Sequence, residues 1–149
     1  MSYTRIWVHC VWGTKSRYPF INESNKRDIL EHICKNAEEK GIYLDFINAY
    51  KDHVHCLFSL NPDQSVGKIL NLIKGESSRW INKNIAVDGR FEWADEFYAA
   101  SISNSMINRV REYIKDQDIH HSARSWLDEE VEIQRLISKP EISYAQAHD

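Results

Sequence analysis

The chain has few cysteines, no long apolar run and no excess of positive charge, and each absence removes a class of protein. Its three cysteines, Cys10, Cys34 and Cys56, are widely spaced and form no C-x-x-C pair. This odd, scattered set predicts reduced thiols in a cytosolic protein, and argues against a disulfide framework or a zinc knuckle. No apolar stretch approaches the roughly 20 residues of a membrane span, and no signal-peptide pattern opens the sequence.

The overall composition is that of an ordinary globular protein. The chain has 149 residues, of which 42% are hydrophobic and 28% charged, and its formal net charge is −3. This length suits one domain with its own core. Because there is no global basic signature, any nucleic acid partner would have to meet positive charge that is gathered locally.

The most informative stretch runs from Asp52 to Phe58 and predicts a buried strand. Side chains alternate faces along a strand, so His53 and His55 point the same way. Two imidazoles side by side on a sheet can hold a divalent metal, provided that a third ligand comes from elsewhere. The alternative is a pair of ordinary sheet histidines. The opposite face carries the apolar side chains Val54, Cys56 and Phe58.

The hydrophobic periodicity predicts a strand, helix, strand, strand, helix, strand, helix order. This order matches an α+β fold with a ferredoxin-like βαββαβ sheet and an added C-terminal catalytic helix. The expected elements are a strand over 3–12, a helix from an N-cap at Asn22 to Gly41, a strand over 42–50, a Lys51-Asp52 turn, the histidine strand, a helix from Ser65 to about 81, a strand over 97–103 and a helix from Ser103 or Ser105 to about His120.

Such a fold places both early helices on one face of the sheet. That face would carry an apolar set, and nothing in the first six elements would cover the other face, which is therefore available as a site. The set predicted under the helices is Ile6, Val8, Val54, Cys56 and Phe58, and the open face carries His9, His53 and His55.

The third helix contains a second group of chemically capable residues. At 100° per residue one arc gathers Val110, Tyr113, Ile114, Gln117, His120 and His121. Tyr113 and Gln117 are four residues apart and therefore neighbours, although a phenol and an amide there could simply pack and share a hydrogen bond.

Taken with the histidines, this helix suggests a phosphoryl-transfer site. His53, His55 and the Gln117 amide oxygen would be metal ligands, and the Tyr113 oxygen could attack phosphorus. A phenol with an ordinary pKa of about 10 needs a nearby cation or base for this role. The sequence leaves that group open among His120, His121 and Lys115.

Three blocks of sequence, in this order, carry a family resemblance. They are His9-x-Val11-Trp12-x-Thr14-Lys15-x-Arg17-x-Pro19, Asp52-His53-Val54-His55 and Tyr113-Ile114-x-x-Gln117-x-x-His120-His121. The chain from about Tyr3 to His121 resembles the single-tyrosine HUH transposases of small bacterial insertion sequences, including the REP-associated relatives.

The resemblance implies a DNA transposase that cuts and rejoins single strands at hairpins near the ends of its element. It implies Tyr113 as the nucleophile of a 5′-phosphotyrosine intermediate, with His53, His55 and Gln117 holding Mg²⁺ or Mn²⁺. It also implies a homodimer in which each site takes its tyrosine helix from the other subunit. His9, His120 and His121 are candidate supporting residues. Candidate DNA contacts, by charge and placement, are Arg5, Lys15, Arg17, Lys68, Lys74 and Arg79.

The expected catalytic domain covers residues 1–121, and 122–149 form an acidic extension that is part of the same domain or loosely ordered. Two other functions remain open. A host-kept relative, replication initiator or relaxase would keep the HUH chemistry, although the short chain without a helicase favours the transposase. A non-catalytic module of the same fold could instead bind single strands by stacking bases on Trp7, Trp12 or Trp93.

Overall fold

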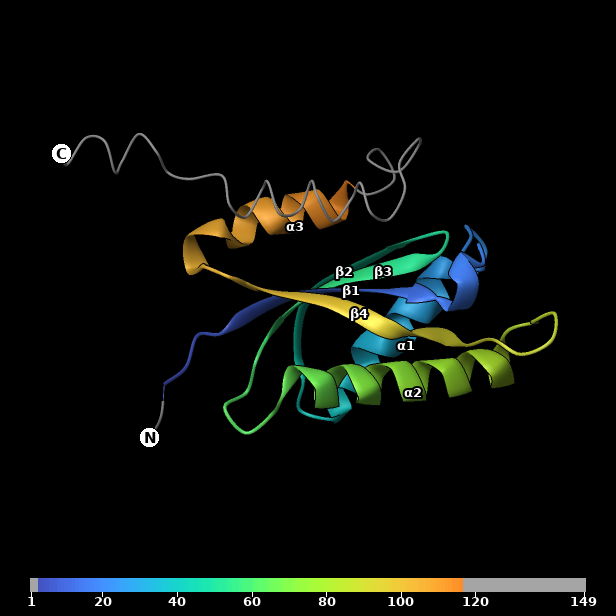
Figure 1. Cartoon of the computed structure of the whole chain (residues 1–149), viewed down its shortest axis with the longest axis horizontal. Helices are drawn as coiled ribbons and strands as arrows, with labels where there is room; N and C mark the ends of the chain where they lie inside the picture. Colours follow the sequence, from blue (N-terminus) through green and yellow to red (C-terminus); the bar gives the residue numbers. More distant parts are fainter. Residues whose placement is uncertain (1–2, 117–149) are drawn as a thin grey trace.

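The structure is a computed structural model of the whole chain, and it describes residues 3–116 (Figure 1). Gln117, His120, His121 and the extension 122–149 therefore lie outside the described residues. The elements in order are β1 (Trp7–Thr14), η1 (Lys15–Arg17), α1 (Lys26–Glu39), β2 (Tyr43–Tyr50), β3 (His53–Ser59), α2 (Val66–Asn84), β4 (Trp93–Ile102), η2 (Asn104–Met106) and α3 (Ile107–Lys115).

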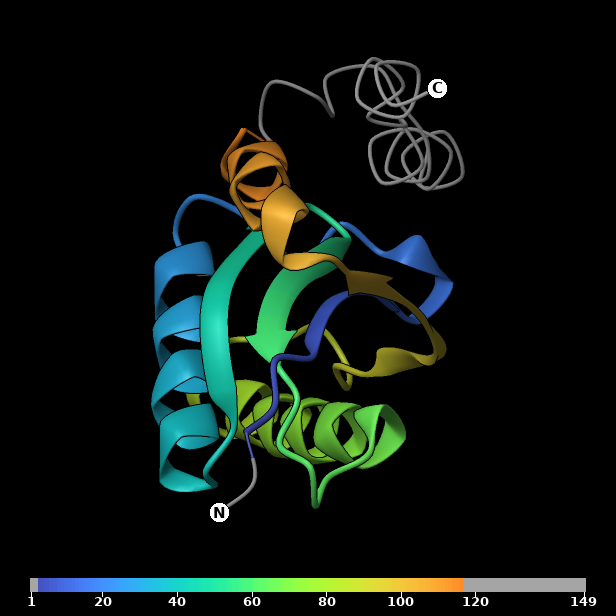
Figure 2. The same ribbon diagram turned by 90° about the vertical axis from the view of Figure 1, so that its left-hand side faces the viewer.

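The four strands form one antiparallel sheet in the order β2-β3-β1-β4. Helices α1 and α2 lie on one side of the sheet and α3 on the other, as Figures 1 and 2 show from two directions. The predicted α+β, ferredoxin-like architecture with an added third helix is confirmed.

Two predicted strands differ from the observed ones at their ends. β1 starts at Trp7 and continues to Thr14, because Thr14 pairs with Trp93 after an irregularity in the β1–β4 register. The same pairing starts β4 at Trp93, four residues before the predicted Phe97. Gly13, which follows the predicted end of this strand at residue 12, lies in the strand, where a Cβ atom would come 3.3 Å from the Asp52 carbonyl oxygen.

The helix predictions hold in type and shift at their starts. α1 begins at Lys26, because the Asn22 side chain instead accepts the backbone N–H groups of Ser24 and Asn25 in a preceding turn. Gly41 follows this helix with a φ of +71°, as expected of a C′ glycine. Ser65 caps α2 as predicted, since its hydroxyl accepts the Lys68 N–H at 3.1 Å.

The main core lies between the sheet and the pair α1 and α2. Val8, Val54, Cys56 and Phe58 are buried there as predicted. Ile6 is not, because it precedes β1 and is 41% exposed. Cys10 and Cys56 face each other in the β1–β3 register, and burial raises the pKa of the Cys10 thiol to about 12 and that of Cys56 well above its usual range. All three cysteines are free, as expected.

A second, smaller core holds α3 on the opposite face of the sheet. It consists of Trp7, Leu57, Ile102, Met106, Ile107, Val110 and Ile114. Two polar contacts to β2 supplement it. Arg111 forms a two-point ion pair with Asp45, with both N···O distances 2.7 Å, and the Asn48 amide donates to the Ile114 carbonyl at 2.8 Å. α3 therefore covers the histidine face that the first six elements leave open.

The described helices are also informative about membranes. None of those within residues 3–116 combines the length and the apolar character that crossing a bilayer requires.

The position of Phe58 in the main core generates a stability prediction. We expect Phe58→Ala to lower the free energy of unfolding by about 3–5 kcal/mol, because a buried phenyl group is lost and a cavity remains. The matched control is Phe97→Ala, at a ring that is 41% exposed, which should cost less than about 0.5 kcal/mol. Urea unfolding measures both, and equal losses would contradict this assignment of the core.

Candidate active site

Three histidines meet on the sheet face beneath α3. β3 presents His53 and His55, and the neighbouring β1 presents His9, all of them buried. The His53 and His55 rings are 5.1 Å apart between centroids, and the His9 and His55 rings 5.2 Å apart. The alternation predicted for the histidine strand is confirmed, and the sequence expectation that all three share a face is confirmed with it.

Each of the two paired histidines has a defined neighbour at Nδ1. His53 Nδ1 lies 2.6 Å from a carboxylate oxygen of Asp52, and His55 Nδ1 lies 3.1 Å from Nε2 of His9. A carboxylate can only accept, so a neutral His53 donates from Nδ1, and Nε2 is the nitrogen that could bind a metal ion. This carboxylate–histidine arrangement is typical of metal-ligating imidazoles, whose second nitrogen is held by a neighbour.

Asp52 also accepts a hydrogen bond from Arg17, whose Nε lies 2.9 Å from the other carboxylate oxygen. Partial burial raises the pKa of the Asp52 carboxyl, but the hydrogen bonds from His53 and Arg17 together outweigh burial and bring the pKa below its usual value. The group is therefore a carboxylate at neutral pH, which suits it to orient His53.

The segment after β1 carries Arg17 to this position. Ser16 and Arg17 have φ values of 57° and 58°, the left-handed region that non-glycine residues seldom occupy. The Thr14 N–H donates to the Asp52 carbonyl at 2.8 Å and ties this segment to the β2–β3 turn. The sequence predicts a turn at Lys51-Asp52 and offers Lys15 and Arg17 only as candidate DNA contacts. The link between Arg17 and Asp52 was missed, although Asp52 stands directly before His53.

Tyr113 reaches the same site from α3. It is 7% exposed, and its ring centroid lies 6.0 Å from that of His55, with the ring planes at 61°. The helical arc predicted for Val110, Tyr113 and Ile114 is confirmed, because all three are buried against the sheet. Lys115 ends the helix and is exposed.

The donor set is suited to a divalent metal only if further ligands join the two histidines. Within residues 3–116 no three side chains of the His, Cys, Asp and Glu types are grouped so that they could hold an ion. His53 and His55 nevertheless both have Nδ1 at hydrogen-bonding distance from a neighbour, so Nε2 is the nitrogen of each ring that could coordinate an ion when it carries no proton. Two neutral imidazoles and an amide oxygen fit a hard ion whose shell is completed by substrate oxygens. The predicted amide, Gln117, lies outside the described residues.

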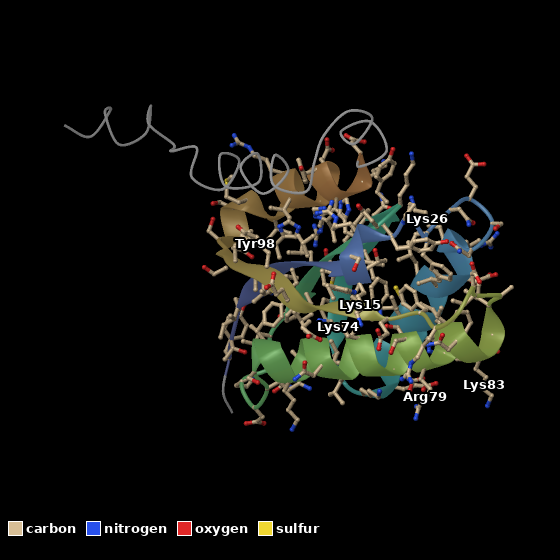
Figure 3. The ribbon with its side chains drawn as sticks, turned by 45° about the vertical axis from the view of Figure 1, so that its right-hand side comes forward. Lys15, Lys26, Lys74, Arg79, Lys83 and Tyr98 are labelled. Carbon is tan, nitrogen blue, oxygen red and sulfur yellow. The ribbon has the colours of Figure 1, made fainter. Side chains whose placement is uncertain are left out.

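The predicted DNA contacts divide into separate regions. Arg17 joins the site through Asp52, and its neighbour Lys15 pairs with Glu92 at 2.7 Å. The three α2 residues belong to a helix on the far side of the sheet from α3 (Figure 1). Figure 3 labels two of them, Lys74 and Arg79. Burial lowers the pKa of Lys74. Arg5 precedes β1 and donates to the Tyr3 hydroxyl. The α2 residues are Lys68, Lys74 and Arg79.

The tryptophans proposed as stacking platforms are buried. Trp7 packs beneath α3, and Trp12 and Trp93 meet edge to face in the main core with ring centroids 6.0 Å apart. All three are at most 7% exposed, so they present no faces to a bound strand. The stacking basis of the non-catalytic alternative is therefore wrong.

Comparison with known proteins agrees with this site. The family model described as "Transposase IS200 like" matches residues 2–117, a span that includes every residue of the site described above. The chain belongs to this family of transposases. Membership implies a DNA endonuclease or strand-transferase activity.

Individual relatives support the family and its fold. The ISDra2 transposase TnpA of Deinococcus radiodurans is 25% identical over 117 residues, which cover 73% of this chain and 81% of that protein. A candidate transposase from D. radiodurans R1 has a similar structure, with a TM-score of 0.63, 19% identity and coverage of 78% and 93% of the two chains. A REP-associated tyrosine transposase bound to a REP hairpin matches with a TM-score of 0.63, 14% identity and coverage of 82% and 72%.

Proposed function

We propose that this transposase cuts and rejoins single-stranded DNA at hairpin-bearing element ends through a 5′-phosphotyrosine on Tyr113. His53, His55 and Gln117 are the proposed ligands of Mg²⁺ or Mn²⁺. The observation that carries the proposal is the position of Tyr113 over His55, in a buried site built from both ends of the described chain. A phenol beside a pair of imidazoles oriented through Nδ1 has the groups that this chemistry needs.

The proposed reaction is an exchange of phosphodiester bonds. The Tyr113 oxygen attacks phosphorus and forms a P–O bond, while the bond to the 3′-oxygen of the preceding nucleotide breaks. The phenol loses a proton and the leaving 3′-oxygen gains one, so a free 3′-hydroxyl and a 5′-phosphotyrosine result. Rejoining is the reverse attack by a 3′-hydroxyl. The bond energy stays in the ester, so no nucleotide cofactor is needed.

The protein's own residues prepare this step by position. β3 fixes the direction of both imidazoles, Asp52 and Arg17 hold His53, and the second core holds the tyrosine helix over them. When bound by neutral ligands, the metal ion keeps its full charge and polarises a phosphate oxygen. Because the reacting groups are already held in place, less translational and rotational entropy has to be lost when the tyrosine attacks.

Hairpin DNA is the proposed ligand because one relative of the same fold was solved bound to a REP hairpin. Lys15 and Arg17 are the proposed phosphate contacts nearest the histidines. The net charge of −3 predicts modest affinity for DNA in general, because phosphate contacts supply most non-specific binding. Hairpin shape would therefore contribute much of the selectivity.

The first prediction concerns the nucleophile. Tyr113→Phe should fold and bind hairpin DNA but form no covalent adduct with a single-stranded oligonucleotide, because it lacks the attacking oxygen. A denaturing gel measures the adduct. Tyr50→Phe is the matched control, because the Tyr50 ring centroid lies 6.4 Å from that of His53, and this variant should still form the adduct. An adduct in the Tyr113→Phe variant would transfer the role to Tyr3, Tyr43, Tyr50 or Tyr98.

The second prediction concerns the metal. Cleavage should stop in chelator and return with Mg²⁺ or Mn²⁺, because the ion supplies the charge that polarises the phosphate. His55→Ala should lose cleavage and keep most of its hairpin binding, which gel shift measures in chelator. His32→Ala, at a histidine between α1 and α2, is the control and should cleave normally. Full activity without divalent ions would refute the metal mechanism.

Assembly is the third part of the proposal. In the single chain described, α3 lies on its own sheet. The same contacts could form between two chains if the helices are exchanged, because a swapped element meets an identical surface. The connection through Ser103 and η2 is the natural place for such a crossing. We propose a homodimer in which each site takes Tyr113 from the partner.

Complementation tests the exchange. Tyr113→Phe and His55→Ala should each be inactive alone, whereas mixing should restore cleavage, because an exchanged mixed dimer has one site with both lesions and one with neither. The expected yield is about half the wild-type activity per mixed dimer, as two-fold symmetry supplies two equal sites. Mixed dimers verified by mass that do not cleave would exclude exchange and leave the role of Tyr113 intact.

A further inference from the structure

We infer that His9 is a positioning residue for His55: its Nε2 accepts the Nδ1–H of His55 and so leaves His55 Nε2 as the nitrogen that faces the metal. The inference rests on the proposed function, since it assigns a task to a residue beside one of the proposed ligands. It concerns neutral imidazoles and the choice of tautomer. It parallels the role of Asp52 at His53, with an imidazole in place of a carboxylate.

The geometry of the pair is the first argument. His9 Nε2 and His55 Nδ1 are 3.1 Å apart, the ring centroids are 5.2 Å apart, and the two ring planes differ by only 20°. Both side chains, from β1 and β3, are fully buried. A buried contact at hydrogen-bonding distance must have one donor and one acceptor, so the two neutral rings have to adopt complementary tautomers.

Only one of the two complementary pairings permits a metal at His55. If His9 donates from Nε2, then His55 accepts at Nδ1 and carries its own proton on Nε2, where it would block coordination. If His55 donates from Nδ1, its Nε2 has a lone pair for the ion, and His9 carries its proton on Nδ1. The tautomer of a ligating histidine is set by the hydrogen bond at its other nitrogen. His9 is that partner here.

The position of His9 in the sheet is the second argument. Its neighbours on the same face of β1 are Trp7 and Val11, both buried, so the site favours an apolar side chain on packing grounds alone. Burying an imidazole there costs free energy, and the contact of its Nε2 with His55 offsets part of that cost. Tyr98 of β4, labelled in Figure 3, packs edge to face against the His9 ring, with the ring centroids 6.4 Å apart. This contact helps to fix the plane of the His9 ring.

The two ligands would then differ in donor strength. The negative charge of Asp52 makes His53 Nε2 more basic and therefore a stronger metal ligand. His55 faces a neutral ring and gains no such effect. A neutral partner orients His55 without adding charge to the site next to Tyr113. An added negative charge would oppose both the approach of a phosphate and the formation of a phenolate.

The test compares two substitutions of His9 in the non-cleaving Tyr113→Phe background. His9→Leu fills the space but offers no acceptor, whereas His9→Gln offers an amide oxygen near the original nitrogen. The dissociation constant of Mn²⁺ is measured by electron paramagnetic resonance with an uncleaved hairpin oligonucleotide bound. We expect His9→Leu to weaken binding about 10–100-fold, the usual effect of losing such a partner, and His9→Gln to recover most of that loss.

The controls separate positioning from folding. His32→Leu is the matched substitution, at a histidine stacked on Trp80 with centroids 4.5 Å apart in the other layer, and it should leave Mn²⁺ affinity unchanged. Imidazole ¹⁵N shifts of the wild-type protein give a readout that needs no substitution. With Mg²⁺ bound, they should show His55 protonated at Nδ1 and His9 also protonated at Nδ1.

The failures of the two proposals are distinguishable. A wild-type protein that neither binds Mn²⁺ nor cleaves would refute the proposed function. A wild-type protein that binds Mn²⁺ while folded His9→Leu binds it equally tightly would refute only the role of His9. Metal-loaded His55 protonated at Nε2 would refute that role as well, even if His9→Leu fails to fold.

Discussion

The antiparallel register of β1 against β3 is the constraint on which both faces of the sheet depend. It sets Cys10 opposite Cys56 in the main core and Val11 opposite His55 on the other face. A slip by one residue would turn both histidines of β3 into the apolar layer under α1 and α2, where their nitrogens would lack partners. The interlocked pattern of large apolar and histidine side chains therefore defines one register, and the position of the site follows from it.

A second set of contacts fixes the direction of the His53 imidazole. The two left-handed residues after β1 aim Arg17 at Asp52, and Asp52 in turn holds His53. Unfavourable backbone conformations of this kind persist where surrounding contacts determine them, here the Thr14 hydrogen bond to the Asp52 carbonyl and the carboxylate itself. Orientation at the site is thus obtained from local strain beside it, while the helices on the far face supply the stability.

The parts of this structure that sequence could predict are those with a strict period. Alternation placed His53 and His55 on one face, and helical spacing placed Tyr113 on the inner face of α3. The start of β4 and the extension of β1 to Thr14 depend on pairing between strands about 80 residues apart, which no local pattern contains. Arg17 could not be joined to Asp52 from sequence, because the left-handed turn that aims it uses Ser16, a residue with no preference for that conformation.

The contacts that hold α3 on the sheet do not depend on whether the helix comes from the same chain or from a partner chain. The apolar contacts of α3 and its Arg111–Asp45 pair bind it to the sheet, and Met106 of η2, in the connection that precedes α3, packs in the same apolar cluster. Exchange between two chains would keep the contacts between α3 and the strands and would change the path from Ile102 to Ile107. The balance between a helix on its own sheet and one on a partner's therefore depends on that short connection and on protein concentration. The chemistry proposed for Tyr113 would be the same in either arrangement, because what it requires is a tyrosine held over His55.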